Sequence, residues 1–488
     1  MLQRLLLSVI LTFFLVPAAL GGTGLALPDL GSGSIRILAG TQEEHIGRSI
    51  LNELRRANLV LEDPEINEYI QDLGSRLVAV ADNGPVEFTF FVIRDDSINA
   101  FALPGGYVGV HSGLIARTRT ESELASVLAH EVAHVTQRHI ARRFEAGSGA
   151  NLKSLAILLG AIALAATGSS GDDVTGAMML GQGLAIQEQI NFTRAQEYEA
   201  DRVGVEILAA ANFDPVGMVS FFEIMQRIQR LQNSRMPEFL STHPLSLSRV
   251  SEAAQRVQQM DSGRETHESR SYPLMKARLG VLAGTNPLLL GAADEQDDGK
   301  TLRYAQALDL LKHGEAATAV PLLRTLLLED DSVIHYHIGL GKALVESGAH
   351  DEAITVFEKA SRLFPGNVPV GLAHAEALRR NNRASDALGV LRDLFNRREP
   401  KPEYLRIMAQ SAAEARAKAE SHYYMSEFYL RTGDMASARE QLHLALEAAP
   451  PASSEYLQYQ ARFEEVSDAL LEFRSRQPRQ RDQEPRSR

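Results

Sequence analysis

Apolar residues recur at intervals of three to four along most of this 488-residue chain, which predicts a mainly helical protein. Residues 27–40 contain scattered glycine and serine and are expected to form an extended leader, whereas residues 42–81 have the helical spacing. The period then shortens, so residues 86–93 are predicted to form a strand, and residues 101–110 form more strand around a Pro-Gly-Gly turn. Further helices are expected at residues 121–134, 192–210, 218–231 and 274–282.

The C-terminal part of the chain repeats itself every 34 residues. Small or turn-forming residues recur at this distance, each followed five positions later by alanine: Gly314, Gly348 and Asn382, with Ala319, Ala353 and Ala387. Gly433 and Ala438 keep the spacing of five but lie 51 residues past the third pair, one unit plus 17, which indicates one inserted helix. This period is typical of tetratricopeptide helix pairs, which stack into a concave surface for protein segments. A plain α-helical bundle is the alternative.

The most informative chemical feature is the sequence His130-Glu131-Val132-Ala133-His134, an HExxH motif in a predicted helix. Residues four apart lie on one face of an α-helix, so both imidazoles can reach one metal ion. Neutral imidazole is a good zinc ligand, and a glutamate beside the first histidine can serve as the general base. The alternative is a solvated helical face that carries two histidines by chance.

A second motif, ExxAD, lies downstream at Glu197-Tyr198-Glu199-Ala200-Asp201. A gluzincin-type site needs a third protein ligand and leaves the fourth position to water. Glu197 and Asp201 are four residues apart, so one carboxylate can bind the metal while the other holds a ligand imidazole through its free N–H. Such spacing is common on solvated helices, but after an HExxH motif it indicates a metal site. Glu199 does not occupy a ligand position, so its loss is expected to affect the metal far less than loss of Glu197.

The two motifs, the stretch from Ile98 to Val108 and the sequence Ser241-Thr242-His243-Pro244 resemble the zinc metallopeptidases of family M48. The likeness is greatest to a periplasmic branch that joins the protease domain to tetratricopeptide repeats. It implies metal-dependent endoproteolysis and a role in outer-membrane quality control. It also implies that His243 can close onto zinc as a fourth ligand and silence the enzyme. The residues alone indicate only a zinc hydrolase with a helical-repeat partner domain.

The expected site holds one zinc ion per chain, bound by His130, His134 and Glu197, with Asp201 orienting a ligand. The metal lowers the pKa of its water and polarises the scissile carbonyl. Glu131 is expected to take the proton of this water and to deliver it to the leaving amine.

Two further features bear on catalysis and substrate binding. Arg249, six residues after His243, is a candidate catalytic residue that stabilises a developing oxyanion; a salt bridge on a helix surface is the alternative. Asn99, Ala100 and Phe101 are candidates for an edge strand that holds a peptide extended by main-chain hydrogen bonds, an assignment that the family resemblance supports. An ordinary sheet edge is the alternative.

Residues 1–26 are predicted to form a cleaved secretory signal peptide, because Arg4 precedes an apolar core and small residues follow. A transmembrane anchor is the alternative, but the apolar core of about 12 residues is short of the roughly 20 that a span requires. The absence of cysteine excludes lipoprotein anchoring and suits an oxidising compartment. The net charge of −12 argues against nucleic acid as a partner.

Residues 155–186 combine an apolar run with glycine-rich breaks. The run is too short to span a bilayer. It is either a helical hairpin buried in the domain or a mobile apolar loop that covers the active site or makes peripheral contact with a membrane.

Together these features predict an α+β fold that is mainly helical, with a zincin-type metalloprotease domain that contains a small β-sheet and then an α-solenoid of tetratricopeptide-like repeats. The expected boundaries are 27–265 for the protease domain, 266–300 for a connecting segment, 301–473 for the repeats and 474–488 for a disordered basic tail.

The expected function is that of a zinc-dependent endopeptidase in the periplasm of a Gram-negative bacterium. By the family resemblance, it also acts as a chaperone in outer-membrane protein assembly and degrades misassembled β-barrel proteins. The expected partners are misfolded or stalled outer-membrane proteins and, through the repeats, the outer-membrane β-barrel assembly machinery. The alternative is chiefly a repeat-based periplasmic chaperone or assembly scaffold with latent peptidase activity.

Overall fold

The fold is known from a computed structural model, which describes residues 33–82, 84, 86–140, 142, 193–231, 238–260, 266, 269–285 and 299–476. The predicted signal peptide, the apolar segment at residues 155–186 and residues 477–488 of the predicted basic tail lie outside the described residues, whereas residues 474–476 of that tail are helical. Among the helices that are described, none combines the length and the hydropathy needed to cross a bilayer.

The N-terminal domain begins with two helices, α1 (Gly33–Arg56) and α2 (Pro64–Val78). The prediction of an extended leader is wrong for residues 33–40, because a run rich in isoleucine, leucine and alanine continues the helix despite its glycines. The helical stretch predicted for residues 42–81 is two helices, since Asp63 caps α2 by accepting a hydrogen bond from the backbone N–H of the residue three positions on, over 3.1 Å.

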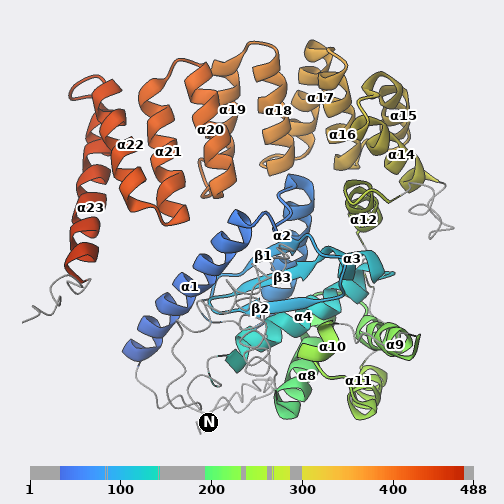
Figure 1. Ribbon diagram of the computed structural model, residues 1–488. Helices are drawn as coiled ribbons and strands as arrows, with labels where there is room; N and C mark the ends of the chain where they lie inside the picture. The colour runs from blue at the N-terminus through green and yellow to red at the C-terminus, as the bar shows by residue number, and fades with distance from the viewer. Residues whose placement is uncertain are drawn as a thin grey trace, which may run out of the picture.

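Three short strands follow: β1 (Thr89–Ile93), β2 (Ala100–Leu103) and β3 (Tyr107–His111). Their order in the sheet is β1-β3-β2, with β1 parallel to β3 and β2 antiparallel to it. The hairpin between β2 and β3 turns at Gly105 and Gly106, as predicted. Within the described part of the chain β2 pairs with β3 alone, so β2 forms one edge of the sheet (Figure 1).

Helix α4 (Glu121–Thr136) runs through the centre of the domain. Its residues are buried from the first turn as far as His134, and Leu124, Leu128 and Val132 belong to one core with side chains of β1 and β3. The helices around it are α3 (Ser112–Arg117), α8 (Arg194–Ala210), α9 (Val216–Leu231), α10 (Glu238–Thr242) and α11 (Leu247–Gln259). The protein is therefore mainly helical with a small sheet, as expected.

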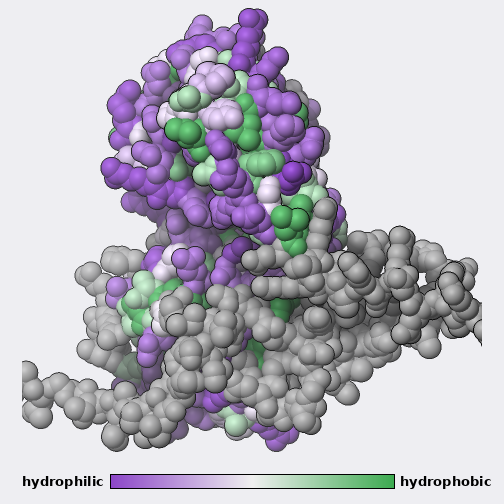
Figure 2. Space-filling view, turned by 90° about the vertical axis from the view of Figure 1, so that its left-hand side faces the viewer, coloured by the Kyte–Doolittle hydropathy of each residue, from purple (hydrophilic) through white to green (hydrophobic). Residues whose placement is uncertain are grey.

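The C-terminal domain is a row of paired helices that arches over the N-terminal domain in Figure 1. The surface that Figure 2 shows of this domain is mostly hydrophilic, because the helices bury their apolar sides against one another. The helices are α14 (Lys300–Lys312), α15 (Ala316–Glu329), α16 (Ile334–Glu346), α17 (His350–Leu363), α18 (Val368–Arg380), α19 (Ala384–Phe395), α20 (Pro402–Glu414), α21 (Lys418–Thr432), α22 (Met435–Ala448) and α23 (Ser454–Arg476).

The turns within the helix pairs follow the predicted period. Gly314, Gly348 and Asn382 have positive φ angles of 81°, 84° and 58°, and Arg416, 34 residues after Asn382, continues the series at 63°. The next positive angle at a helix junction is that of Gly433, 86°, 17 residues later. The inserted helix that the 17-residue offset predicted is α21, which lies between these last two turns.

A buried ion-pair network joins the two domains. Glu65 of α2 is 1% exposed, and its carboxylate lies 3.1 Å from Arg278, 2.9 Å from Lys342 and 3.1 Å from His335. Burial alone would raise the pKa of Glu65, but the charges of Arg278 and Lys342 and a hydrogen bond with His335 hold it well below its usual value. Arg278 belongs to α12 (Ser271–Leu282), whose apolar side chains are buried, so the predicted connecting segment is part of the packing between the domains.

Gly348 offers a test of the repeat geometry, because its φ is 84° and a Cβ there would meet nothing within 4 Å. Gly348→Ala is expected to lower the free energy of unfolding by roughly 1–2 kcal/mol, since an L side chain is strained at that angle. Gly348→Asn should cost less, because Asn382 adopts the same conformation at the equivalent position. Urea unfolding followed by circular dichroism measures both, and equal stability of all three proteins would show that φ does not select the residue here.

Candidate metal centre

Helix α4 directs two histidines at one point. Thr120 caps its N-terminus by accepting a hydrogen bond from the backbone N–H of Glu123 over 3.1 Å. Farther along the helix, His130 and His134 are 3% and 0% exposed, and their Nε2 atoms are 3.0 Å apart. The helix therefore presents both imidazoles on one face, as the HExxH spacing predicted.

Helix α8 brings Glu197 to the same point. Its N-terminus is capped by Thr193, whose hydroxyl accepts a backbone hydrogen bond. The helix packs closely on α4 because Gly204 has no side chain: a Cβ there would lie 3.2 Å from the backbone nitrogen of His130. Glu197 is 1% exposed, and its carboxylate oxygens lie 3.5 Å from Nε2 of His130 and of His134.

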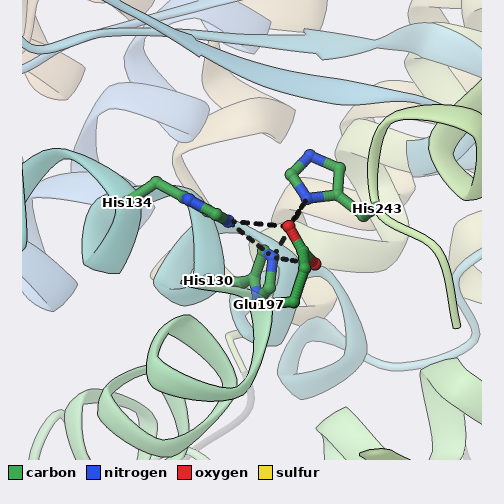
Figure 3. Close-up of side chains that lie close together, drawn as sticks. All are labelled: His130, His134, Glu197 and His243. Carbon is green, nitrogen blue, oxygen red and sulfur yellow. Dashed lines mark hydrogen bonds and ion pairs between the residues drawn. The ribbon is translucent and has the colours of Figure 1, made fainter. Parts of the chain in front are cut away.

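A third histidine joins the cluster from another element. His243 directly follows α10, and its Nδ1 lies 3.2 Å from Nε2 of His130 and 3.0 Å from Oε1 of Glu197 (Figure 3). Together with His134, these residues offer four ligand atoms that all lie within 4.8 Å of one another. Donors on a tetrahedral zinc ion with bonds near 2 Å are about 3.3 Å apart. The donor types and their spacing therefore fit a zinc ion.

Asp201 and Arg249 lie directly behind the cluster. Oδ1 of Asp201 is 3.0 Å from Nδ1 of His130, the ring nitrogen on the side away from the other ligand atoms. Arg249 of α11 donates to both carboxylate oxygens of Asp201 over 2.7 Å, and its Nη1 lies 2.8 Å from Oε2 of Glu197. Because Arg249 is 2% exposed, its salt bridge is buried and does not lie on a helix surface. Its catalytic role stays a prediction.

The buried groups shift one another's pKa. Burial would raise the pKa of Glu197, but His243 and His130 hold it well below its usual value. Burial would lower the pKa of His130, yet Asp201 and Glu197 raise it to about 9. Burial lowers the pKa of His134 well below its usual value, and His130 adds to the effect. A bound metal ion would take the place of the proton on His130, because ligand imidazoles coordinate in the neutral form.

Glu131 lies between this cluster and the sheet. It is 0% exposed, and its Oε1 is 3.4 Å from Nε2 of His243. The backbone of Ala102 in β2 lowers the pKa of its carboxyl group, but burial has the larger effect. Burial raises the pKa of Glu131. Such a shift moves a carboxyl group toward the range in which it can serve as a general base.

The candidate edge strand is next to this carboxyl group. Ala100 and Phe101 are the first residues of β2, and Asn99 directly precedes them. Asn99 and Ala100 are 4% and 0% exposed, while Phe101 is half-buried. The predicted substrate strand is thus an edge strand beside the metal cluster, and its binding of a peptide stays a prediction.

One residue that the motifs did not single out also contacts the cluster. The Nδ1 atoms of His134 and His139 are 2.9 Å apart, and Nε2 of His139 lies 3.0 Å from Oε2 of Glu199. His139 is five residues after His134, a spacing that does not place it on the same helical face. The only sign of it in the sequence is a third histidine close behind the HExxH motif.

Known protein families match both domains. Residues 64–257 match the model of peptidase family M48, and this range includes every residue of the cluster. Residues 304–368 and 344–411 match two models of tetratricopeptide repeats. The repeat matches fall on the paired helices from α14 to α20.

Several curated proteins are similar to the chain. The beta-barrel assembly-enhancing protease of Escherichia coli (strain K12) is 31% identical over 464 residues, which are 92% of each chain. A protein of Vibrio cholerae that carries the same name provisionally is 37% identical over 344 residues, 69% of this chain and 70% of that one. The mitochondrial metalloendopeptidase OMA1 of Schizosaccharomyces pombe is 30% identical over 211 residues, 43% of this chain and 59% of that one.

Arg249→Met is expected to lower the free energy of unfolding by roughly 3–5 kcal/mol, because it removes the buried guanidinium that contacts the carboxylates of both Asp201 and Glu197. The matched control is Arg256→Met on the same helix, where the arginine is partly exposed and pairs with Glu252, and where the loss should be under about 1 kcal/mol. Urea unfolding of the metal-free proteins at neutral pH measures both losses. Equal losses would mean that Arg249 contributes no more than a surface cation.

Proposed function

The chain belongs to peptidase family M48 and is a metallopeptidase, and we propose that it is a zinc-dependent endopeptidase with His130, His134 and Glu197 as its zinc ligands. The observation that carries the proposal is the buried cluster of these residues, whose donor types and spacing fit zinc. Asp201 supports it by orienting His130, because its carboxylate lies 3.0 Å from the imidazole nitrogen that would not bind the metal.

The reaction is hydrolysis of a peptide bond. When bound, the metal would polarise the scissile carbonyl group and lower the pKa of a water molecule. Glu131 takes the proton of the attacking water and delivers it to the leaving nitrogen as the peptide bond breaks. Its raised pKa supports this role, because a carboxyl group that titrates nearer to neutral pH both accepts and releases a proton readily.

The edge strand is the proposed substrate site. A peptide would pair with the main chain at Asn99, Ala100 and Phe101 and so lie extended beside Glu131. Arg249, in contrast, already contacts two carboxylates and the carbonyl of the residue after His243. These contacts favour a positioning role for Arg249 over a contact with the developing oxyanion.

Glu131→Gln is expected to abolish peptide hydrolysis, because an amide cannot accept the proton of the attacking water. Zinc content should stay at the wild-type level, since Glu131 is not one of the proposed ligands. Casein cleavage and zinc content are measured on the same preparation. The wild-type protein treated with a chelator serves as the control, and it should lose activity and regain it when zinc is added. Turnover near the wild-type rate would remove Glu131 from the mechanism.

We also propose that His243 keeps the peptidase latent. Its Nδ1 lies among the ligand atoms, while its Nε2 lies 3.4 Å from Glu131. A fourth protein ligand takes the position that a catalytic site leaves to water, and the site then resembles a structural zinc site. One imidazole would thus occupy the place of the water and face the base that should activate it.

His243→Ala is expected to raise cleavage of casein and of the protein itself, because it returns the fourth position to water. A tenfold gain would correspond to about 1.4 kcal/mol in favour of the latched state. His313→Ala, at an exposed histidine of the repeat domain, is the control and should cleave at the wild-type rate. The double variant with Glu131→Gln should be silent. Cleavage by His243→Ala at or below the wild-type rate would reject the latch.

The proposed cellular role is the assembly of outer-membrane β-barrel proteins in the periplasm of a Gram-negative bacterium, both as a chaperone and as a protease that removes misassembled barrels. The names of relatives that match over most of the chain support this role. The repeats support protein partners, since stacked helix pairs bind protein segments. The proposed partners are misfolded or stalled outer-membrane proteins and the β-barrel assembly machinery.

The Glu131→Gln variant also separates this role from that of a scaffold with latent peptidase activity. The variant is expressed in cells from which the gene for this protein has been deleted. If proteolysis is the main task, these cells should accumulate misassembled outer-membrane proteins as the deletion strain does. If the chain is chiefly a chaperone or scaffold, the variant should restore barrel assembly as fully as the wild-type protein.

A further inference from the structure

A chain of contacts leads from a proposed zinc ligand to the surface of α8. Nδ1 of His134 is 2.9 Å from Nδ1 of His139, and Nε2 of His139 is 3.0 Å from Oε2 of Glu199. Both histidines are 0% exposed. The side chain of Glu199 is 33% exposed and accepts a further hydrogen bond from Arg142 over 3.1 Å.

Glu199, the last residue in this series of contacts, determines which nitrogen atoms donate and which accept. An ionised carboxylate only accepts hydrogen bonds, so Nε2 of His139 must carry the proton that faces Glu199. In a neutral imidazole the other nitrogen then has a lone pair, so Nδ1 of His139 accepts from Nδ1–H of His134. With its proton on Nδ1, neutral His134 has its lone pair on Nε2, which is the atom that lies in the cluster.

We propose that His139 and Glu199 are positioning residues that fix the tautomer and the ring orientation of His134 for zinc. The inference rests on the proposed zinc-dependent function. Helix α8 would then orient both ligand imidazoles of α4: Asp201 faces His130 directly, and Glu199 acts on His134 through His139. Groups that hold the free nitrogen of a ligand imidazole in this way also raise its basicity as a ligand.

The backbone holds His139 in place for this role. After α4 the chain passes through Arg138 with a φ of 53°, an angle that costs a non-glycine residue free energy, and this turn brings His139 back toward His134. The carbonyl of His139 then accepts a hydrogen bond from the side chain of Gln196 in α8, over 3.4 Å. His139 is thus tied to α8 by its backbone as well as by its ring.

Loss of Glu199 is still expected to affect the metal less than loss of Glu197, but the proposed positioning role predicts that it has an effect of its own. Glu199 points roughly 200° around α8 from Glu197, so helical periodicity separates the two. His139 connects Glu199 to the cluster because its imidazole spans the distance that the glutamate side chain does not cover.

The test is the zinc affinity of the full-length protein, measured by competition with a chromophoric chelator. His139→Leu and Glu199→Ala are expected to weaken zinc binding by about 10- to 100-fold. His139→Asn should bind more tightly than His139→Leu, because an amide oxygen at the place of Nδ1 can still accept from Nδ1–H of His134. The matched control is Glu206→Gln at an exposed carboxylate of the same helix, which should bind as the wild type does.

Two further measurements separate positioning from a general structural role. The visible absorption of the cobalt(II)-loaded proteins should shift in His139→Leu and return toward the wild-type spectrum in His139→Asn. Thermal unfolding of the metal-free proteins should place both variants within a few degrees of the wild type. If both variants lose zinc affinity equally and the metal-free proteins are equally destabilised, the role is structural and the inference is wrong.

The remaining outcomes separate this inference from the proposed function. Failure of the wild-type protein to bind zinc would overturn the proposed zinc-dependent function itself. Tight zinc binding by the wild type with unchanged affinity in His139→Leu and Glu199→Ala would overturn the positioning role alone.

Discussion

The protease domain depends on ionised groups that are buried where α4, α8 and α11 meet. Glu197 and Asp201 are 1% and 6% exposed, and an unpaired carboxylate at such depth would cost several kcal/mol. Arg249 contacts both and, together with His130, supplies the positive charge that keeps Asp201 ionised, while His243 and His130 do the same for Glu197. Both carboxylates in turn face His130. A metal ion at this point would add positive charge to the same group, so binding of the metal and stability of the domain are linked.

Helical periodicity made part of this site predictable from the sequence. His130 and His134 are four residues apart, so the sequence alone places them on one face of α4 and predicts a helix with the carboxylate ligand nearby. The contacts of Arg249 and His139 are of another kind. Arg249 reaches Asp201 across 48 residues of sequence, and His139 reaches His134 through a turn with a positive φ. Neither contact follows from a spacing, because each depends on how the helices pack.

The repeats show the same limit. Glycine and asparagine at the turns predicted the 34-residue period, but Arg416 continues it without a turn-forming side chain. A positive φ is uncommon for arginine, so the packing of α20 against α21 imposes it. The ion pairs at the junction between the domains could not be predicted either, because Glu65 and Arg278 belong to segments that are far apart in the sequence. Patterns in the sequence predict the elements, whereas the ion pairs that join them depend on tertiary structure.

The latch proposed for His243 is attached to the proposed substrate strand. The backbone N–H of His243 donates to the carbonyl of Phe239 over 2.7 Å, and the N–H of Phe239 donates to the carbonyl of Ile98 over 3.1 Å, just ahead of β2. The rings of Phe239 and His243 also stack, with centroids 4.9 Å apart. A movement that withdraws His243 from the ligand cluster therefore has to break these contacts or carry them along. A peptide that paired along β2 would act on the same stretch of backbone, so the two proposals together imply that occupation of the substrate edge and release of the latch are coupled.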